Sequence, residues 1–198
     1  MIGAYPNMPS EHIFALSIFD YYSIVDPIFV DPDVSTILSA TKTQVETWYE
    51  GSVDSRRQVM APRLDQGGQD MVVLTKYDQG KYSSARDNYS GYDAQPLIRL
   101  SEMYYIAAEC RISGPDKDLG EARSLLQEVR KARAVYDELD ANLDEAGLMA
   151  QLEKEYRKEF ICEGVVFYFY KRLGYEKLPR QSDVMSGSKV IDDAVYML

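Results

Sequence analysis

The sequence contains few of the residues that carry most protein chemistry. Among its 198 residues there are two cysteines, Cys110 and Cys162, and a single histidine, His12. Two cysteines are too few for a disulfide scaffold. Both lie among apolar residues in a helical pattern, so we expect them to be buried thiols. One histidine removes most histidine-based catalysis and most zinc chemistry from consideration.

Long apolar runs and positive charge are also scarce. No apolar run approaches the roughly 20 residues that span a bilayer. The opening MIGAYPNMPSEH has neither the basic nor the apolar region of a signal peptide, although a signal could belong to a longer precursor. Basic residues number 22 against 32 acidic ones, which gives a net charge of −10. Because no basic stripe offsets this charge, we expect no nucleic-acid binding.

The first 95 residues differ in character from the rest of the chain. Residues 1–50 are rich in aromatics and are interrupted by Pro27 and Pro32, which predicts short strands and loops. Residues 51–95 contain a possible strand in DMVVLTKYD and then the polar, tyrosine-dotted GKYSSARDNYSGYD. A connection of this length is usually functional or poorly ordered. We predict a loop-rich, aromatic-rich segment with short strands and helices over residues 1–95.

From residue 96 the sequence predicts a helical hairpin. In PLIRLSEMYYIAAECRI, Pro96 stands at a plausible first helical position. Apolar residues cover most of this helix, so we expect it to be buried; they are Leu97, Ile98, Leu100, Met103, Ile106, Ala107 and Cys110. After the turn SGPDKD, LGEARSLLQEVRKAR predicts a second helix. The pair is similar to a tetratricopeptide unit, which must stack on something because one hairpin cannot bury both its faces.

A third helix is predicted to begin near Asp144, whose side chain can cap the amides of the first turn. Its apolar residues recur at steps of four: Leu148, Leu152, Tyr156 and Phe160. We expect Gly164 to interrupt this helix. The run VVFYFY that follows fits either a strand or a short buried helix, since periodicity does not decide so short a run.

Glu155, Glu159 and Glu163 are spaced four residues apart, so on one helix they would share a face. If that face is buried, the carboxylates must be paired or protonated. Basic partners are available, and a guanidinium group can bridge two carboxylates. We therefore expect a structural ion-pair frame made of Arg99, Glu102, Glu109, Glu155, Glu159, Glu163, Lys171 and Arg172.

Two other interpretations of these glutamates stay open, a solvated helix face and an acid site. A di-metal carboxylate site typically needs Glu-x-x-His pairs, and the chain has no histidine after His12. Spacing alone leaves a glycosidase pair of acids open. We expect no metal and no catalytic residue.

Several stretches, in the expected order, resemble proteins of the SusD/RagB family. PLIRLSEMYYIAAEC is similar to the segment in which Arg-Leu-x-Glu opens a helix that ends in Ala-Glu, and EARSLLQEVRKAR is similar to the next helix. EYRKEFICEGVVFYFYKRLG resembles the family's Glu-x-x-x-Glu-Leu-x-x-Glu-Gly and Lys-Arg-x-Gly elements, and SEHIFAL, EGSVDSRR and LTKYDQGKY match weaker signatures. Val166 and Phe169 depart from the family, which often has Arg and Asp there, and Leu173 replaces a usual aromatic.

The resemblance implies a mostly α fold of tetratricopeptide-like hairpins with irregular loop and short-strand insertions. Residues 1–95 and 96–198 would form one SusD-like domain. It also implies a surface lipoprotein of the Bacteroidota outer membrane that captures glycans or other nutrients without catalysis or a cofactor. Such proteins deliver their cargo to a TonB-dependent, SusC-like transporter. Full members are much longer, so we expect a C-terminal portion or a short relative, with the lipid anchor in a longer precursor.

Capture of a glycan needs aromatic faces and neighbouring polar groups in a largely preformed site. The candidate ligand residues are Tyr21, Tyr22, Trp48 and Tyr49. A tryptophan or a tyrosine pair also commonly fills a core. Two alternative functions stay open, a helical protein-interaction module without sugar binding and a carboxylate-based hydrolase.

Overall fold

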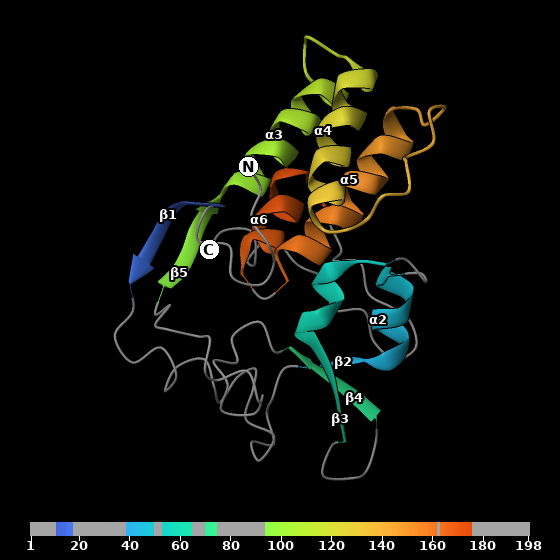
Figure 1. The fold of residues 1–198 in the computed structure, drawn as a ribbon. Coiled ribbons are helices and arrows are strands. Elements are labelled where there is room, and N and C mark those ends of the chain that lie inside the picture. The colour runs from blue at the N-terminus through green and yellow to red at the C-terminus, as the bar shows by residue number, and fades with distance from the viewer. Residues whose placement is uncertain are drawn as a thin grey trace. The chain divides into compact units, whose positions relative to one another are not determined.

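The computed structural model describes residues 11–17, 39–49, 53–64, 70–74, 94–161 and 163–175. In chain order the elements are β1 (His12–Ser17), β2 (Ser39–Thr41), α2 (Lys42–Tyr49), the 3-10 helix η2 (Ser55–Val59), β3 (Met60–Leu64), β4 (Asp70–Leu74), β5 (Ala94–Arg99), α3 (Leu100–Ser113), α4 (Leu119–Ala132), α5 (Glu145–Glu159) and α6 (Val165–Arg172). The described part of the chain is mostly helical, which confirms the predicted fold class (Figure 1). The chain divides into two compact units, residues 1–155 and residues 156–198.

In the first unit, β1 and β5 pair antiparallel in a two-stranded sheet, with Phe14 opposite Ile98 (Figure 1). The prediction that Pro96 begins a helix is wrong, because Pro96 lies inside β5, opposite Ala15, and α3 begins at Leu100. Proline favours extended backbone in the residue before it. The pairing strand comes from the start of the chain, so no local pattern shows it.

Three further strands form an antiparallel sheet in the order β2–β4–β3. The central strand β4 confirms the strand predicted in DMVVLTKYD. Pro62 lies in β3, at an edge of this sheet, where a residue without a backbone N–H is tolerated. Helix α2 contributes Val45 and Tyr49 to a small apolar cluster with Val72 of β4, and Trp48 packs against that cluster.

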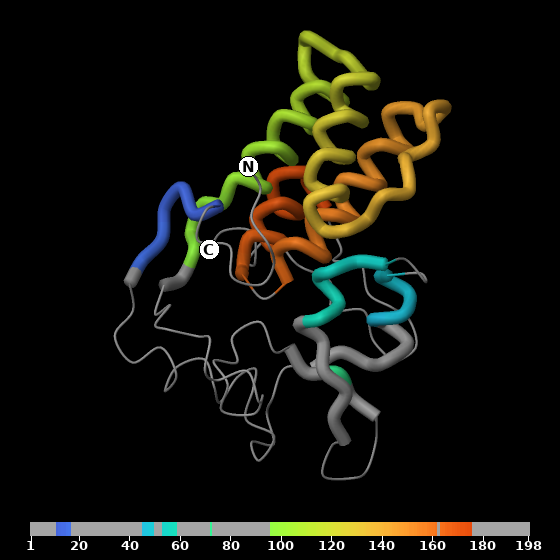
Figure 2. The backbone as a smooth tube through the Cα atoms, viewed as in Figure 1, coloured from blue at the N-terminus to red at the C-terminus, as the bar shows by residue number. Residues whose placement is uncertain are grey.

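The predicted hairpin of α3 and α4 is confirmed, and the two helices pack along each other (Figures 1 and 2). Their fully buried apolar side chains are Tyr105, Ala108 and Ile112 on α3 and Ala122, Leu126 and Val129 on α4. Gly114 ends α3, and a Cβ there would lie 2.3 Å from the carbonyl oxygen of Cys110, so the turn requires glycine. Asp118 caps α4, since its side chain accepts a hydrogen bond of 2.9 Å from the Glu121 N–H.

Helix α3 is buried on one side, although its apolar content predicted a buried helix. Ser101, Tyr105, Ala108 and Ile112 are its buried residues. Met103, Ile106 and Cys110 are exposed, so the expectation of a fully buried helix is wrong, as is that of a buried thiol at Cys110. A helix that is apolar nearly all round does not itself indicate which side its hairpin partner covers. Cys162 lies outside the described residues.

The end of α4 turns the chain through a Schellman motif. The Val135 N–H donates to the Arg130 carbonyl at 2.9 Å, and the Ala134 N–H donates to the Lys131 carbonyl at 3.1 Å. Ala134 has a φ of 63°, a conformation that glycine usually supplies at this position. Further along, the Asp144 side chain accepts a hydrogen bond of 2.8 Å from the Gly147 N–H, which confirms the predicted cap of α5.

The second unit is organised by aromatic side chains at the end of α5 and on α6. The ring of Tyr156 stacks on that of Phe169 with centroids 4.3 Å apart, and the Phe160 ring lies 4.8 Å from Tyr156. Gly164 has a φ of 81° and separates the two helices, as predicted. The run VVFYFY forms α6, so of the two alternatives left open by the sequence the helix is observed.

Candidate functional site

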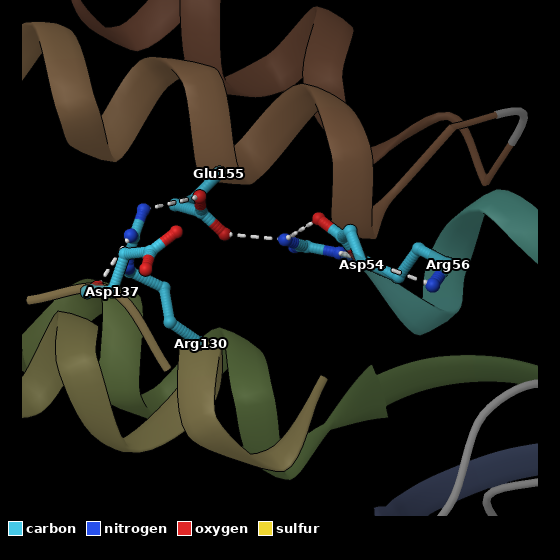
Figure 3. A network of polar contacts seen from close by, with 5 residues as sticks. All are labelled: Asp54, Arg56, Arg130, Asp137 and Glu155. Carbon is cyan, nitrogen blue, oxygen red and sulfur yellow. Dashed lines mark hydrogen bonds and ion pairs between the residues drawn. The ribbon is translucent and has the colours of Figure 1, made fainter. Parts of the chain in front are cut away.

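Glu155 on α5 is fully buried and contacts two arginines that come from other parts of the first unit (Figure 3). Its Oε2 accepts a hydrogen bond of 2.7 Å from Arg56 Nη2, and its Oε1 accepts one of 3.4 Å from Arg130 Nη1. Arg56 also donates to Asp54 through Nε at 2.9 Å and Nη2 at 2.7 Å. Arg130 Nη2 donates to the backbone carbonyl of Asp137 at 2.9 Å. Two carboxylates therefore meet two guanidinium groups.

Asp54 immediately precedes η2 and Arg56 lies in its first turn, and local bonds fix this segment. Asp54 Oδ1 accepts a hydrogen bond of 3.1 Å from the backbone N–H of Arg56, in addition to the side-chain bonds. The backbone N–H of Ser55 donates to the carbonyl of Arg133 at 2.8 Å. The Arg56 side chain is thereby aimed at α5, and both it and Asp54 have no exposed side-chain surface. These two residues belong to EGSVDSRR, which resembled a weak family signature.

A second buried cluster of the first unit centres on Glu11, immediately before β1. Glu11 Oε2 lies 2.9 Å from Arg133 Nη2 and 3.7 Å from Arg99 Nη1. Arg99 Nη1 also lies within hydrogen-bond distance of Ser101 Oγ, at 3.2 Å. Arg99 ends β5 and Arg133 follows α4, so this cluster joins the start of β1 to the open end of the α3–α4 hairpin. Charge-assisted hydrogen bonds of this kind are strong when both partners are buried.

The residues of the predicted ion-pair frame have different environments. Arg99, Glu155 and Glu159 are buried, Glu102, Glu109, Glu163 and Lys171 are half-buried, and Arg172 is exposed. Helix α5 ends at Glu159, so Glu163 does not continue its face. The arginines that contact Glu155, Arg56 and Arg130, were not among the predicted partners. That all eight residues form a single frame stays a prediction.

Sequence reasoning missed these partners because each is remote in the chain from the acid that it meets. Arg56 and Glu155 are 99 residues apart, and Arg133 and Glu11 are 122 apart. The four-residue spacing of the glutamates describes the acids alone. It carries no information on the arginines that pair with them. The available signals were the arginine-rich end of LGEARSLLQEVRKAR and the EGSVDSRR stretch.

In the second unit, basic side chains lie over aromatic rings. The guanidinium carbon of Arg172 is 5.8 Å from the ring centroid of Phe169, and that of Arg157 is 6.0 Å from the ring centroid of Tyr170. Such contacts place a cation over the negative face of the ring. Gly174 follows with a φ of 70°, which allows the left-handed end of α6. These contacts give a structural reason for the sequence Lys-Arg-x-Gly at this point.

The candidate ligand residues fall into three groups. Tyr21 and Tyr22 lie outside the described residues. Tyr49 is 1% exposed and forms part of the cluster with Val45 and Val72. Trp48 is half-buried and packs against that cluster.

Two further aromatic side chains are open to solvent and were not singled out from the sequence. Tyr136 is 71% exposed in the connection between α4 and α5, and Tyr168 is 65% exposed on α6.

Within the residues that the structure describes, no group of three or more histidine, cysteine or acidic residues is placed to hold a metal ion. Among those same residues, none of the helices has the length and apolar content of a membrane span. What the geometry shows at Glu155 is a carboxylate whose two oxygens both engage arginines away from solvent. Such an arrangement holds separate segments of chain in place.

Comparison with known proteins identifies the class of protein. A model of the SusD family matches residues 18–192. The fold is similar to a SusD superfamily protein from Bacteroides vulgatus ATCC 8482, with a TM-score of 0.64 and 18% identity over 83% of this chain and 40% of that chain. A SusD homolog from Bacteroides thetaiotaomicron VPI-5482 gives 0.56 and 17% over 85% and 38%. No curated protein matches the chain.

The chain belongs to the SusD family. It spans two fifths or less of the length of the solved relatives that it matches. Proteins of this family are generally non-catalytic and are associated with the binding of nutrients such as glycans. Proteins of this family work with SusC-like transporters.

Proposed function

We propose that this chain takes part in the capture of a glycan or another small nutrient at the outer-membrane surface. The captured molecule would be imported through a TonB-dependent, SusC-like transporter. The observation that carries this proposal is the match to the SusD family over residues 18–192. Capture by binding requires a surface with aromatic and polar groups, and it needs no acid–base chemistry.

The environment of Glu155 supports binding over catalysis. Both of its carboxylate oxygens accept hydrogen bonds from guanidinium groups, and its side chain has no exposed surface. A catalytic acid or base has to come within hydrogen-bond reach of the substrate. A carboxylate held between Arg56 and Arg130 is instead suited to fixing the fold.

Trp48 makes the binding step measurable, because it is the only tryptophan in the chain. The residue is half-buried and packs against the cluster of Val45, Tyr49 and Val72. A sugar stacked on that ring changes both the emission of Trp48 and the heat of titration. We therefore expect saturable heat with one class in a panel of glycans, together with a shift in tryptophan emission.

The matched variants are Trp48→Ala and Tyr136→Ala. Loss of one stacking ring removes roughly 1 kcal/mol, which corresponds to an affinity weakened about fivefold for Trp48→Ala. Tyr136→Ala, in a different segment, should leave the affinity unchanged. Absence of heat with every sugar, combined with saturable binding to a transporter, would favour the protein-interaction module instead. Unchanged affinity in Trp48→Ala would move the site to other aromatic residues, Tyr21 and Tyr22 first.

The hydrolase alternative is separated by Glu159→Gln. Glu159 is fully buried near the end of α5. If the chain hydrolyses a substrate through this carboxylate, the substitution abolishes turnover. On our proposal it lowers the melting temperature, and there is no turnover to lose.

A further inference from the structure

Three polar side chains of α4 hold the connection that leads from α4 to α5. Arg123, Gln127 and Arg130 are spaced by four and three residues, so they lie on one side of the helix. Arg130 Nη2 and Gln127 Nε2 both donate to the backbone carbonyl of Asp137, at 2.9 Å and 3.2 Å. Arg123 Nε donates to the backbone carbonyl of Asp140 at 3.1 Å. Helix α4 therefore fixes the main chain of the connection.

Two polar atoms of this group are buried without a hydrogen bond. Gln127 Oε1 is an acceptor and Arg130 Nε is a donor, and neither has a partner among the residues that the structure describes. A buried polar group without a hydrogen bond is costly, so such atoms are uncommon in folded proteins. Exchange of the amide oxygen and nitrogen of Gln127 does not help, because the oxygen would then face the carbonyl oxygen of Asp137.

The two atoms lie beside the same acceptor. Because Gln127 and Arg130 both contact the carbonyl oxygen of Asp137, the ends of their side chains converge there. In a guanidinium group, the Nε–H and one N–H of Nη2 form a fork that points in a single direction. Arg130 Nε is therefore directed to the same place as its Nη2, next to the amide of Gln127. Figure 3 shows the Arg130 side chain between Asp137 and Glu155.

The chemistry of the two atoms limits what can occupy this place. The occupant must accept a hydrogen bond from Arg130 Nε and donate one to Gln127 Oε1. A carboxylate only accepts and an ammonium group only donates, so each would satisfy one of the two atoms. The occupant must also be small, because Gln127 is only 7% exposed. A water molecule meets both conditions, and buried waters typically make about three hydrogen bonds to otherwise unsatisfied polar groups.

We propose that one water molecule binds beneath the α4–α5 connection and joins Gln127 Oε1 to Arg130 Nε. It completes the hydrogen bonding of Arg130, whose Nη1 also donates to Glu155 at 3.4 Å. The buried network of Figure 3 runs from Asp54 through Arg56 and Glu155 to Arg130, and the water extends it to a second side chain of α4. This water site is a structural part of the first unit and is independent of nutrient capture.

The first test uses nuclear magnetic resonance on the whole, isotope-labelled chain. We expect a nuclear Overhauser effect between the Nε–H proton of Arg130 and water, with the sign of a water that tumbles with the protein. Gln127→Met keeps the length of the side chain without its acceptor and should remove this signal. Glu128→Met, at the neighbouring exposed position, should leave the signal unchanged. Circular dichroism checks that both variants fold. If Gln127→Met unfolds, Gln127→Glu replaces it, because a carboxylate accepts directly from Arg130 and displaces the water.

The second test is a crystal structure, in which we expect a density peak about 2.7–3.2 Å from both Gln127 Oε1 and Arg130 Nε. Two results would each overturn the proposal. One is a crystal structure in which no density peak lies within hydrogen-bond distance of both atoms. The other is a water signal that is absent from the unaltered chain or is equally strong in Gln127→Met. Failure of glycan binding in the Trp48 experiment would leave these results unaffected, so the two proposals fail separately.

Discussion

The ion pairs of the first unit are of two kinds, and they differ in exposure more than in distance. Arg56 and Glu155 are 2.7 Å apart and have no exposed side-chain surface. Arg111 and Glu121 are also 2.7 Å apart, yet their side chains are 37% and 46% exposed. An exposed pair contributes about 0–1 kcal/mol because hydration and side-chain entropy offset the attraction. Removing one partner of a buried pair costs about 3–5 kcal/mol because it leaves an uncompensated charge.

The difference shows what each kind of pair does. The exposed pair Arg111–Glu121 joins two helices that the hairpin already brings together, and the exposed pair Lys117–Glu145 joins the turn before α4 to the start of α5. The buried pairs Arg56–Glu155 and Arg133–Glu11 join residues that are 99 and 122 positions apart in the sequence. These two buried pairs therefore help to specify which distant segments meet. Exposed pairs add little to an arrangement that apolar packing already fixes.

The largest effect is expected from Arg56→Met. It leaves Asp54 and one oxygen of Glu155 buried without the guanidinium group that they share, so the free energy of unfolding should fall by about 3–5 kcal/mol. Urea unfolding followed by circular dichroism measures this change. Arg57→Met is the matched control, because Arg57 is the next residue of η2 and is exposed. Equal small losses for both variants would remove the distinction between buried and exposed charge.

An intermediate effect is expected from Asp118→Ala. Asp118 is exposed, but its carboxylate caps the first turn of α4 through the Glu121 N–H. Loss of a cap costs about 1 kcal/mol, more than an exposed ion pair and less than a buried one. Asp116→Ala in the same turn is the control. Arg111 donates a hydrogen bond to the backbone carbonyl of Asp116, and this carbonyl is kept in the variant. Comparable losses at both positions would argue against a specific capping contribution.

The smallest effect is expected from Glu121→Gln, which removes the charge opposite Arg111 while keeping the shape of the side chain. The free energy of unfolding should fall by less than about 1 kcal/mol. The loss should vanish in about 1 M salt, where screening reaches only about 3 Å. Glu128→Gln, at an exposed position on the same helix, provides the reference. A loss of several kcal/mol at Glu121, unchanged by salt, would contradict the account.

Features that depend on residues close together in the sequence were predictable, and features that depend on remote contacts were not. The α3–α4 hairpin, the Asp144 cap and the buried residues Leu148 and Leu152 follow from local periodicity and capping, and they are observed. The strand at Pro96 was not predictable from the local sequence, because its partner strand lies at the start of the chain. The exposed side of α3 was not predictable either, since an all-round apolar helix does not indicate which side is covered.

The candidate site was less predictable than the fold for the same reason. The spacing of the glutamates indicated that acids would need partners, but it contained no information on where those partners come from. Asp54 and Arg56 approach Glu155 only after the segment before β3 folds against the helices. Exposure of Trp48 and burial of the adjacent Tyr49 likewise depend on Val72, which lies on another element.

The most direct test of the central claim is a double-mutant cycle of Arg56→Met and Glu155→Met, measured as free energies of unfolding. If buried charge joins η2 to α5, the two single losses are large and the double variant recovers much of the sum. The coupling energy should then reach at least about 2 kcal/mol. Additive losses, with a coupling below about 0.5 kcal/mol, would show that the two side chains act independently and would contradict the account.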